Sequence, residues 1–314
     1  MSDEVTLSAI VPTLNRRDDL LAFVETLIGQ SRRPHELVVV DAGDDRGLPV
    51  ALERALQGSG IRLRYVRSRA GTSLQRNIAL DMARGDIIFF LEDDVLLEPD
   101  YIERTLEVFD LPFDPPVGGV QGTFTNPPRP RGWQQRYFRL FGMTHAVPGD
   151  QAGMSTSGGP RWLIRPSRPV AVPITFAGGS AYLRAAIDGA RFDEFLSGYT
   201  MGEDVEFSFR VGQRWTLVQT PHARLFHTFS AESRPEPGDR IGRLIYSRYY
   251  FFRKHVPKDP QNLAAFAWTN VGLSAFYSGV ALIMKPMGEK GPMLRGIARG
   301  YRRVLDDLRG RPVR

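Results

Sequence analysis

The sequence contains no cysteine among its 314 residues. A disulfide framework, a catalytic thiolate, a zinc ribbon and an iron–sulfur cluster are therefore excluded. The Walker A motif, the Gly-x-Gly-x-x-Gly loop, the His-Glu-x-x-His helix and the Gly-x-Ser-x-Gly elbow are also absent. The sequence thus lacks the motifs that usually indicate a kinase, a dehydrogenase, a zinc protease or a serine hydrolase. Any catalysis has to use oxygen or nitrogen groups.

Negative charge at the very start argues against a secretory signal. Asp3 and Glu4 stand where such a signal carries bases, and Pro12 interrupts a short apolar run. We therefore expect a cytoplasmic protein. With 42% hydrophobic and 24% charged residues, the composition is that of an ordinary globular chain.

The net charge of +6 is concentrated near the C-terminus. Residues 241–314 contain 14 Lys and Arg against 4 Asp and Glu, a balance of +10, so the remaining 240 residues carry −4. A basic nucleic-acid-binding fold is therefore not indicated. The positive charge belongs to a C-terminal extension.

Short β-branched runs alternate with amphipathic stretches in the N-terminal part. Runs at 8–11, 37–40 and 87–91 predict strands, whereas 17–30 and 72–84 have helical spacing, with Thr72 as the expected N-cap of the second helix. This pattern predicts an α/β fold with a mostly parallel sheet flanked by helices. Ligands of such sheets bind at the carboxyl ends of the strands.

The texture changes at residues 111–173, which contain 11 of the 23 prolines. We expect a long irregular insertion, and its aromatic residues favour a packed, substrate-facing segment over a solvated linker. Further along, the patterns predict a helix at 203–211, a strand at 215–219 and a helix at 243–252.

Residues 260–284 form an uncharged run of 25 residues. Its length would permit a bilayer span. However, Thr269, Asn270 and two serines interrupt it, and basic residues flank both ends, so a surface-lying or re-entrant helix fits better. A helix packed on the catalytic domain and a homodimer interface are the alternatives.

Three consecutive acids, Glu92, Asp93 and Asp94, follow the apolar strand at 87–91. Adjacent carboxylates repel one another unless cations offset them, and a hard divalent ion completed by substrate phosphates commonly does so. An acidic turn that merely ends a strand is the alternative.

The order of five motifs resembles that of the family 2 inverting glycosyltransferases, which have the nucleotide-sugar-binding GT-A fold. The resemblance covers roughly residues 5–230. The motifs are Ile-Val-Pro-Thr-Leu-Asn-Arg at 10–16, Val-Val-Val-Asp at 38–41, Ala-Gly-Thr-Ser-Leu-Gln-Arg-Asn at 70–77, Glu-Asp-Asp at 92–94 and Gly-Glu-Asp-Val-Glu at 202–206.

The resemblance implies roles for individual residues on the donor side. It gives the metal to Asp94, the ribose to Glu92, which stands where the family usually has Asp, and the nucleotide or its diphosphate to Arg76. The residues implied in binding the nucleotide-sugar are Pro12, Thr13, Asn15, Asp41, Arg76, Glu92, Asp93 and Gly179. Gly179 is included because the small residues at 177–181 resemble a turn that precedes a helix.

Glu203 and Asp204 resemble the pair that activates the acceptor. An inverting transfer needs a base to accept the proton of the incoming hydroxyl, and Asp204 is the expected base. The alternative for both acids is that they only complement the dipole at a helix N-terminus.

His227 occurs where relatives often place a second metal ligand after a strand, and His222 is the nearby alternative. A structural histidine is equally compatible with the sequence. Gln213-Arg214-Trp215 is not the signature of processive synthases, because it lacks the two residues that separate Gln from Arg-Trp there. We therefore expect one sugar to be added per encounter.

The sequence thus predicts a glycosyltransferase that uses Mg²⁺ or Mn²⁺ and a nucleotide-diphosphate sugar, with a saccharide or lipid-linked acceptor at the inner face of the cytoplasmic membrane. Residues 1–110 would form the nucleotide-sugar-binding half, 111–235 the acceptor-binding and catalytic half, and 236–314 a basic helical extension suited to an anionic membrane surface. A sugar nucleotidyltransferase and a non-catalytic, membrane-attached saccharide-binding module are the competing functions.

Overall fold

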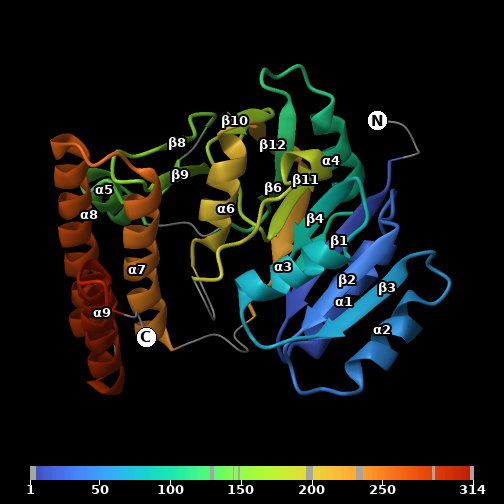
Figure 1. Cartoon of the computed structure of the whole chain (residues 1–314), viewed down its shortest axis with the longest axis horizontal. Helices are drawn as coiled ribbons and strands as arrows, with labels where there is room; N and C mark the ends of the chain where they lie inside the picture. The colour runs from blue at the N-terminus through green and yellow to red at the C-terminus, as the bar shows by residue number, and fades with distance from the viewer. Residues whose placement is uncertain are drawn as a thin grey trace.

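The structure, a computed structural model, describes residues 5–127, 131–143, 145–147, 149–195, 201–230, 236–284 and 287–311. Asp3, Glu4 and Lys285 lie outside these ranges. A twisted central sheet carries helices on both faces, and a layer of C-terminal helices stands beside it (Figure 1). The predicted α/β fold is confirmed.

Four parallel strands form one half of the sheet in the order β4-β1-β2-β3. They are β1 (Leu7–Thr13), β2 (Glu36–Asp41), β3 (Arg62–Arg67) and β4 (Ile87–Leu91). Every residue of β2 and β4 is buried, which explains their continuous apolar runs. The chain leaves β1 toward β2 on one side and returns to β4 on the other, so the topology switches between β1 and β4.

The other half of the sheet is mixed. β11 (Gly179–Leu183) pairs antiparallel with both β4 and β6 (Val117–Phe124), and β6 runs parallel to β12 (Thr216–His227). The edge strand β10 (Val170–Val172) and the short β5 (Val95–Leu97) both pair antiparallel with β12.

The predicted irregular insertion at 111–173 is wrong in part, because β6 is a buried strand inside the sheet. The same region contains α5 (Gly132–Leu140) and a second small sheet in the order β7-β9-β8. Its strands are β7 (His145–Val147), β8 (Gly153–Met154) and β9 (Pro160–Leu163).

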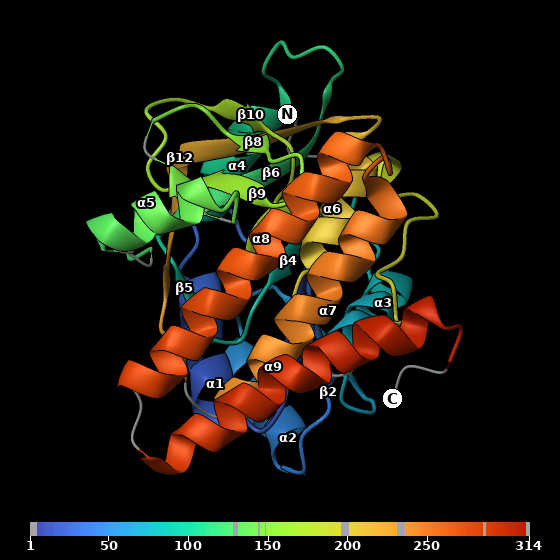
Figure 2. The ribbon, with the colours of Figure 1, turned by 90° about the vertical axis from the view of Figure 1, so that its left-hand side faces the viewer.

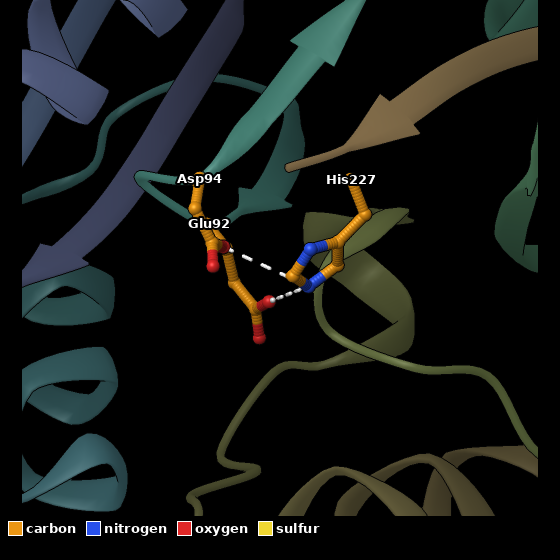
Figure 3. A group of neighbouring side chains, drawn as sticks. All are labelled: Glu92, Asp94 and His227. Atoms are coloured by element: carbon orange, nitrogen blue, oxygen red, sulfur yellow. Dashed lines mark ion pairs between the residues drawn. The ribbon is translucent and has the colours of Figure 1, made fainter. Parts of the chain in front are cut away.

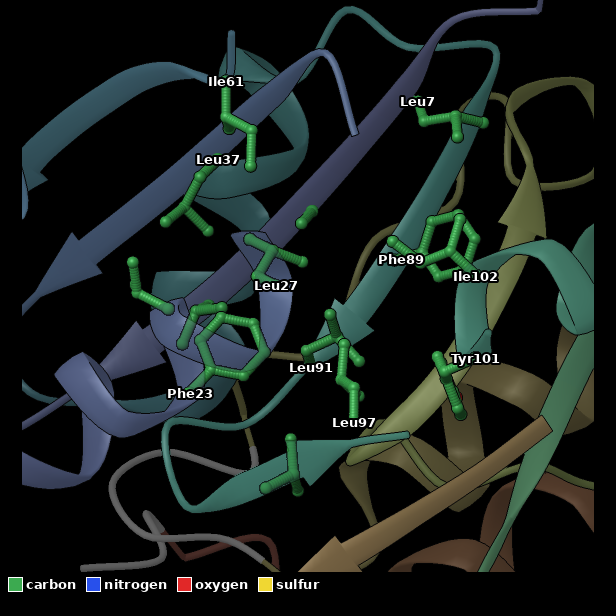
Figure 4. Close-up of a cluster of buried hydrophobic side chains, with 14 of the residues drawn as sticks. Leu7, Phe23, Leu27, Leu37, Ile61, Phe89, Leu91, Leu97, Tyr101 and Ile102 are labelled. Carbon is green, nitrogen blue, oxygen red and sulfur yellow. The ribbon is translucent and has the colours of Figure 1, made fainter. Parts of the chain in front are cut away.

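Two apolar clusters fasten helices to the two faces of the sheet. On one face, α1 (Arg17–Ile28), α2 (Leu48–Leu56) and α4 (Tyr101–Phe109) pack on the strands, as Figure 4 shows for Phe23 and Ile102. On the other face lie α3 (Thr72–Met82) and α6 (Glu203–Gly212). The helix predictions for both α3 and α6 are confirmed, although Gly71 and not Thr72 is the N-cap of α3. A 3₁₀ turn at Arg184–Ala186 follows β11.

The C-terminal layer consists of three helices. They are α7 (Pro237–His255), α8 (Pro260–Gly279), which continues as a π-helical turn at Val280–Met284, and α9 (Met287–Leu308). Helices α7 and α9 cross closely because glycines face each other: a Cβ on Gly242 would lie 2.7 Å from the Gly296 carbonyl oxygen, and one on Gly300 2.8 Å from the Gly242 carbonyl oxygen. Small residues at fixed spacing allow this close approach.

Helix α8 keeps much of its apolar surface in contact with solvent, as expected for a helix that lies on a surface. By length and composition alone, Pro260–Ile283 is apolar enough to cross a membrane, and only 22% of its most apolar window is buried. Figure 2 shows α8 running across the front of the layer, beside α7. Trp268 and Ile283 are 49% and 83% exposed.

Candidate active site

Two cavities open near the carboxyl end of β4. The first, here called the sheet-edge cavity, has a volume of about 270 Å³ and is lined by 12–14, Arg16, 70–72, Gln75, Arg76, 92–94, His227 and Phe229. The second, the helix-side cavity, has a volume of about 490 Å³ and extends from Glu203 and Asp204 to α7, α8 and the insertion. Glu92 lines both cavities. Residues that follow β1 and β4 line the sheet-edge cavity. This cavity therefore lies at the topological switch point, where open α/β sheets bind ligands.

Asp93 connects the ends of β1 and β4. Its carboxylate accepts a hydrogen bond of 2.7 Å from the Thr13 hydroxyl and forms a 2.9 Å ion pair with Arg16. Burial raises the pKa of Asp93 to about 6, against the opposing influence of Arg16. Asp93 thus holds the loop after β1 in place. Unlike Glu92 and Asp94, it does not point toward His227.

Glu92 and Asp94 point together at His227 (Figure 3). The Nε2 atom of His227 lies 3.4 Å from Oε2 of Glu92 and 3.7 Å from Oδ1 of Asp94. The chain leaves β4 at Glu92 and turns at Asp93 and Asp94, so that Glu92 and Asp94 reach His227 while Asp93 contacts Thr13 and Arg16. Burial alone would raise the pKa of Glu92, but the hydrogen bond with His227 and the charge of Arg76 outweigh it and lower that pKa.

Strand pairing brings His227 to the acids from 133 positions further along the chain. β12 pairs with β5 so that His227 is opposite Val95, and the Thr228 amide donates to the Asp94 carbonyl oxygen over 2.9 Å. The Phe229 amide donates to His227 Nδ1 over 2.9 Å, which orients Nε2 toward the carboxylates. His222, the alternative ligand, is exposed and lies outside this group.

The three side chains have the composition of a divalent metal site. Among the described residues, Glu92, Asp94 and His227 each offer a ligand atom, and these atoms lie within 4.8 Å of one another. Two carboxylates and one imidazole suit Mn²⁺ or Mg²⁺, which favour oxygen ligands and tolerate nitrogen. The residues present fit such an ion.

Arg76 joins the walls of the two cavities. Its side chain is 2% exposed and donates to Glu203 over 2.7 Å, while its other terminal nitrogen lies 3.4 Å from Glu92. A buried guanidinium between two carboxylates holds α3, the end of β4 and the start of α6 in a fixed arrangement. Arg76 also lines the sheet-edge cavity.

Asp204 lies in the wall of the helix-side cavity, at the first turn of α6. Its Oδ1 accepts a 2.8 Å hydrogen bond from the Val205 amide. Burial and the neighbouring charge of Glu203 raise the pKa of Asp204 to about 7. A carboxylate with such a pKa is suited to accept a proton near neutral pH.

The loops that follow β1 and β2 are tied together through Asn15 and Asp41. Asn15 adopts a positive φ of 52° and accepts from the Asp44 amide over 2.8 Å. Asp41 is buried, and its two oxygens accept from the Gly43 amide and the Tyr65 hydroxyl, each over 2.6 Å. Pro12 and Thr13 line the sheet-edge cavity, but Asn15 and Asp41 do not.

The expected small-residue turn before a helix at 177–181 is right only in part, because residues 177 and 178 form a turn but a strand, not a helix, follows it. Gly179 begins β11, and its carbonyl oxygen accepts from Tyr101 and Gln121. A Cβ on Gly179 would lie 2.6 Å from Leu225, whereas one on Gly178 would lie 3.1 Å from the Glu92 carboxylate. Gly178 is therefore the glycine that borders the site.

The contacts that two further residues make in the site are visible only in the structure. Arg16 lies in the sheet-edge cavity beside Asp93 and 3.5 Å from Asp94, where it offers positive charge. Gln75 donates to the carbonyl oxygens of Thr13 and Val40 over 2.9 and 2.8 Å and so joins two strand ends. Both residues occur in recognisable motifs, but nothing in their spacing specifies these contacts.

A family model described as glycosyl transferase family 2 matches residues 8–187, which include β1 to β4, the acidic triplet and β11. The chain belongs to this family. It is therefore a glycosyltransferase, and its fold is the GT-A fold of its structural neighbours.

The individual relatives share less than 30% sequence identity with this chain. An uncharacterized glycosyltransferase of Haemophilus influenzae is 29% identical over 33% of this chain and 34% of its own length. The poly(ribitol-phosphate) β-N-acetylglucosaminyltransferase TarP of Staphylococcus aureus is also 29% identical, over 32% of this chain and 31% of its own length. These alignments span about a third of the relatives' length.

The fold is also similar to that of the mannosyltransferase PcManGT from Pyrobaculum calidifontis, solved in complex with GDP-Man and Mn²⁺. The TM-score is 0.59 with 17% identity, and the match covers 96% of this chain and 88% of the other.

Proposed function

We propose that this protein is a metal-dependent inverting glycosyltransferase that transfers a single sugar from a nucleotide-diphosphate sugar to a saccharide or lipid-linked acceptor. The observation that carries this proposal is that two cavities meet at Glu92. Asp204 lies on the helix-side cavity only, across the junction from the switch point. This separation suits attack on the sugar from the side opposite its leaving group.

The nucleotide-sugar occupies the sheet-edge cavity in this proposal, and residues 1–110 form the donor-binding half. Pro12 and Thr13 contact the nucleotide, and Asn15 and Asp41 shape the loops around it. The guanidinium of Arg16 faces the diphosphate, because it lies within 3.5 Å of Asp94 in the same cavity.

Glu92, Asp94 and His227 would hold a divalent ion, Mn²⁺ or Mg²⁺, in this cavity. When bound, such an ion neutralises charge on the departing nucleoside diphosphate. Arg76 keeps Glu92 in place through its pairing with Glu203. The structural neighbour with GDP-Man and Mn²⁺ supports a donor and a metal of these classes.

Asp204 acts as the general base on the acceptor side, where residues 111–235 supply most of the walls. It accepts the proton of the acceptor hydroxyl as that oxygen bonds to the anomeric carbon and the bond to the diphosphate breaks. The nucleoside diphosphate leaves on the opposite face, and the configuration at the anomeric carbon is inverted.

A role in cell-surface polysaccharide or glycolipid synthesis is supported by TarP, whose name gives poly(ribitol-phosphate) as its acceptor. The C-terminal layer supports work at a membrane. Exposed apolar side chains project from α5, α8 and the turn that follows α8: Trp133, Leu140, Leu263, Trp268, Val271, Leu282 and Ile283. We propose that this surface lies on the inner face of the cytoplasmic membrane.

Positive charge from α7 and α9 is the second argument for an anionic membrane surface. Burial together with the nearby charges of Arg243 and Arg299 lowers the pKa of Arg303, so these guanidiniums are crowded. Arg299 also pairs with Asp239 over 2.7 Å. Anionic lipid headgroups would reduce the electrostatic repulsion between these guanidinium groups. A second copy of the chain is the competing occupant of the apolar surface, and sedimentation without lipid distinguishes the two.

The test of the function is a panel of nucleotide-sugars incubated with the protein and Mn²⁺, scored for release of the nucleoside diphosphate. One donor is expected to be hydrolysed, and a chelator is expected to stop the reaction. Hydrolysis that is equally fast without a divalent ion, or in an Asp94→Ala variant, contradicts the metal assignment. Consumption of no donor contradicts the proposed function.

A further inference from the structure

The helix-side cavity has two ends of different chemistry. Glu92, Glu203 and Asp204 supply carboxylates at one end, where the buried guanidinium of Arg76 pairs with both glutamates. Large apolar side chains from α5, β9, α7 and α8 line much of the remainder, among them Phe138, Trp162, Leu244, Phe251, Leu273 and Tyr277. The proposed general base and an apolar wall therefore belong to one cavity.

The size and the wall of this cavity favour an occupant that is partly apolar. Its volume of about 490 Å³ is in the range of pockets that hold one small ligand. A saccharide of several rings has hydroxyl groups around each ring, and each hydroxyl loses its hydrogen bonds to water when it is buried against hydrocarbon. The apolar end of the cavity thus suits hydrocarbon better than it suits further sugar rings.

Two polar side chains of α7 also line the cavity, and both interact with the protein itself. The Ser247 hydroxyl donates to the Leu244 carbonyl oxygen over 3.2 Å. Arg248 interacts electrostatically with Tyr277 and Tyr301. What this end of the cavity offers a ligand is therefore mainly apolar contact.

Contacts between aromatic rings connect the cavity wall with the exposed surface of the C-terminal layer. The ring of Phe276, on α8, lies 4.9 Å from that of Phe138, which lines the cavity, and 6.2 Å from that of Trp133, both measured between ring centroids. Trp133 is 52% exposed and belongs to the surface that we place on the membrane. A ligand bound in the cavity thus has its apolar portion close to that surface.

We propose that the acceptor is a lipid that carries a single sugar. Its apolar portion contacts the wall of the helix-side cavity, and a hydroxyl of its sugar reaches Asp204. The sugar is a single one because the wall and Asp204 line one cavity with the volume of a small ligand. This enzyme therefore acts after a reaction that attaches a first sugar to a lipid. The inference rests on the proposed function, since it names the class of acceptor for the same site.

The test is calorimetric titration of the full-length protein with methyl glucoside, octyl glucoside and octyl maltoside, without donor and with the octyl compounds below their micellar concentrations. Each methylene that leaves water strengthens binding by about 4-fold, so octyl glucoside is expected to bind to one site per chain, at least about 100-fold more tightly than methyl glucoside. Octyl maltoside is expected to bind at least about 10-fold more weakly than octyl glucoside, because its second ring has to fit between the wall and Asp204.

Substitutions locate the octyl chain. Ser247→Leu fills part of the cavity and is expected to weaken binding of octyl glucoside by about 10-fold or more. Gly279→Leu adds the same side chain to α8, where a Cβ has nothing within 4 Å, and as the matched control is expected to leave the affinity unchanged. Circular dichroism establishes that each variant is folded. If Ser247→Leu does not fold, Leu244→Asn, which makes the wall polar at a half-buried position, is expected to have a similar effect.

Four results would overturn the proposal. They are equal binding of methyl and octyl glucoside or binding of neither, binding of octyl maltoside as tight as that of octyl glucoside, full binding by the folded cavity variants, and loss of binding in Ile283→Ser in their place. Ile283 is 83% exposed, so the last result would put the octyl chain on the outer surface. Donor hydrolysis by the parent protein tests the proposed function separately, because it needs no acceptor and these titrations need no donor.

Discussion

Replacing Asp204 by Asn should separate catalysis from stability. The amide has nearly the same shape but cannot accept a proton, so turnover should fall by about 10²-fold or more with little change in donor affinity. In the parent, activity should decline as the pH falls below about 7, because burial and Glu203 raise the pKa of Asp204 to about that value. The variant's residual activity should lack this dependence.

The same raised pKa predicts an effect on folding. In the unfolded chain the pKa of Asp204 returns to about 3.9, so the folded protein holds this proton more tightly. The stability that the proton contributes is complete below about pH 4 and is lost as the pH rises through 7. A difference of about 3 pKa units corresponds to at most about 4 kcal/mol. Because Asp204 is partly exposed, we expect Asp204→Asn to gain about 1–3 kcal/mol at pH 8.

Thermal unfolding without metal or donor, at pH 4.5 and pH 8, measures this gain. The advantage of the variant over the parent should grow between the two pH values by several degrees in Tm. A variant that is less stable than the parent at pH 8, or that retains turnover within a few-fold, would refute the assignment of Asp204. Glu203 or Glu206 would then be the acid to test.

Three further changes test other parts of the site. Asp94→Ala should abolish metal-dependent donor binding and leave the fold intact, since it removes a ligand at a strand end; calorimetry with and without Mn²⁺ measures this, and unchanged metal-dependent affinity would contradict it. Arg76→Met should cost about 3–5 kcal/mol in denaturant unfolding, because two carboxylates lose their buried partner; a loss below about 1 kcal/mol would show that the pairing is unimportant. Replacing four arginines of α9 by Gln should weaken salt-sensitive co-sedimentation with anionic liposomes, and a parent protein that ignores such liposomes at low salt would refute membrane attachment; the four are Arg295, Arg299, Arg302 and Arg303.

The strands β1, β2 and β4 were predictable because they are buried on both faces and therefore read as continuous apolar runs. The strand β3, which is only partly buried and contains three arginines, was not predicted. Nor was β6. Gly118, Gly119 and Gly122 weaken its strand pattern, yet they are required there, since a Cβ at these positions would lie 2.5 to 2.7 Å from the side chains of Trp215, Tyr182 and Tyr101 respectively. Those partners come from distant parts of the chain, which sequence patterns do not connect.

The acidic triplet shows that prediction from sequence patterns is limited in the same way at the site. Its position after β4 predicted a metal centre, and Asp94 and His227 are indeed side by side. The sequence could not show that Asp93 turns away to Thr13 while Glu92 joins the other two, because this depends on the pairing of β12 with β5. Likewise, Arg248 stands in an aromatic run on α7 that reads as ordinary helix core, and only the cavity shows what it faces.

The proposal that the acceptor attacks from the helix-side cavity is tested most directly by the anomeric configuration of the first product. For the donor that the protein hydrolyses, ¹H NMR follows the sugar released before mutarotation equilibrates it. If water or acceptor attacks from the helix-side cavity, an α-linked donor gives the β-anomer first. Initial release of the α-anomer from that donor would contradict the account, because it would require attack from the side of the departing diphosphate.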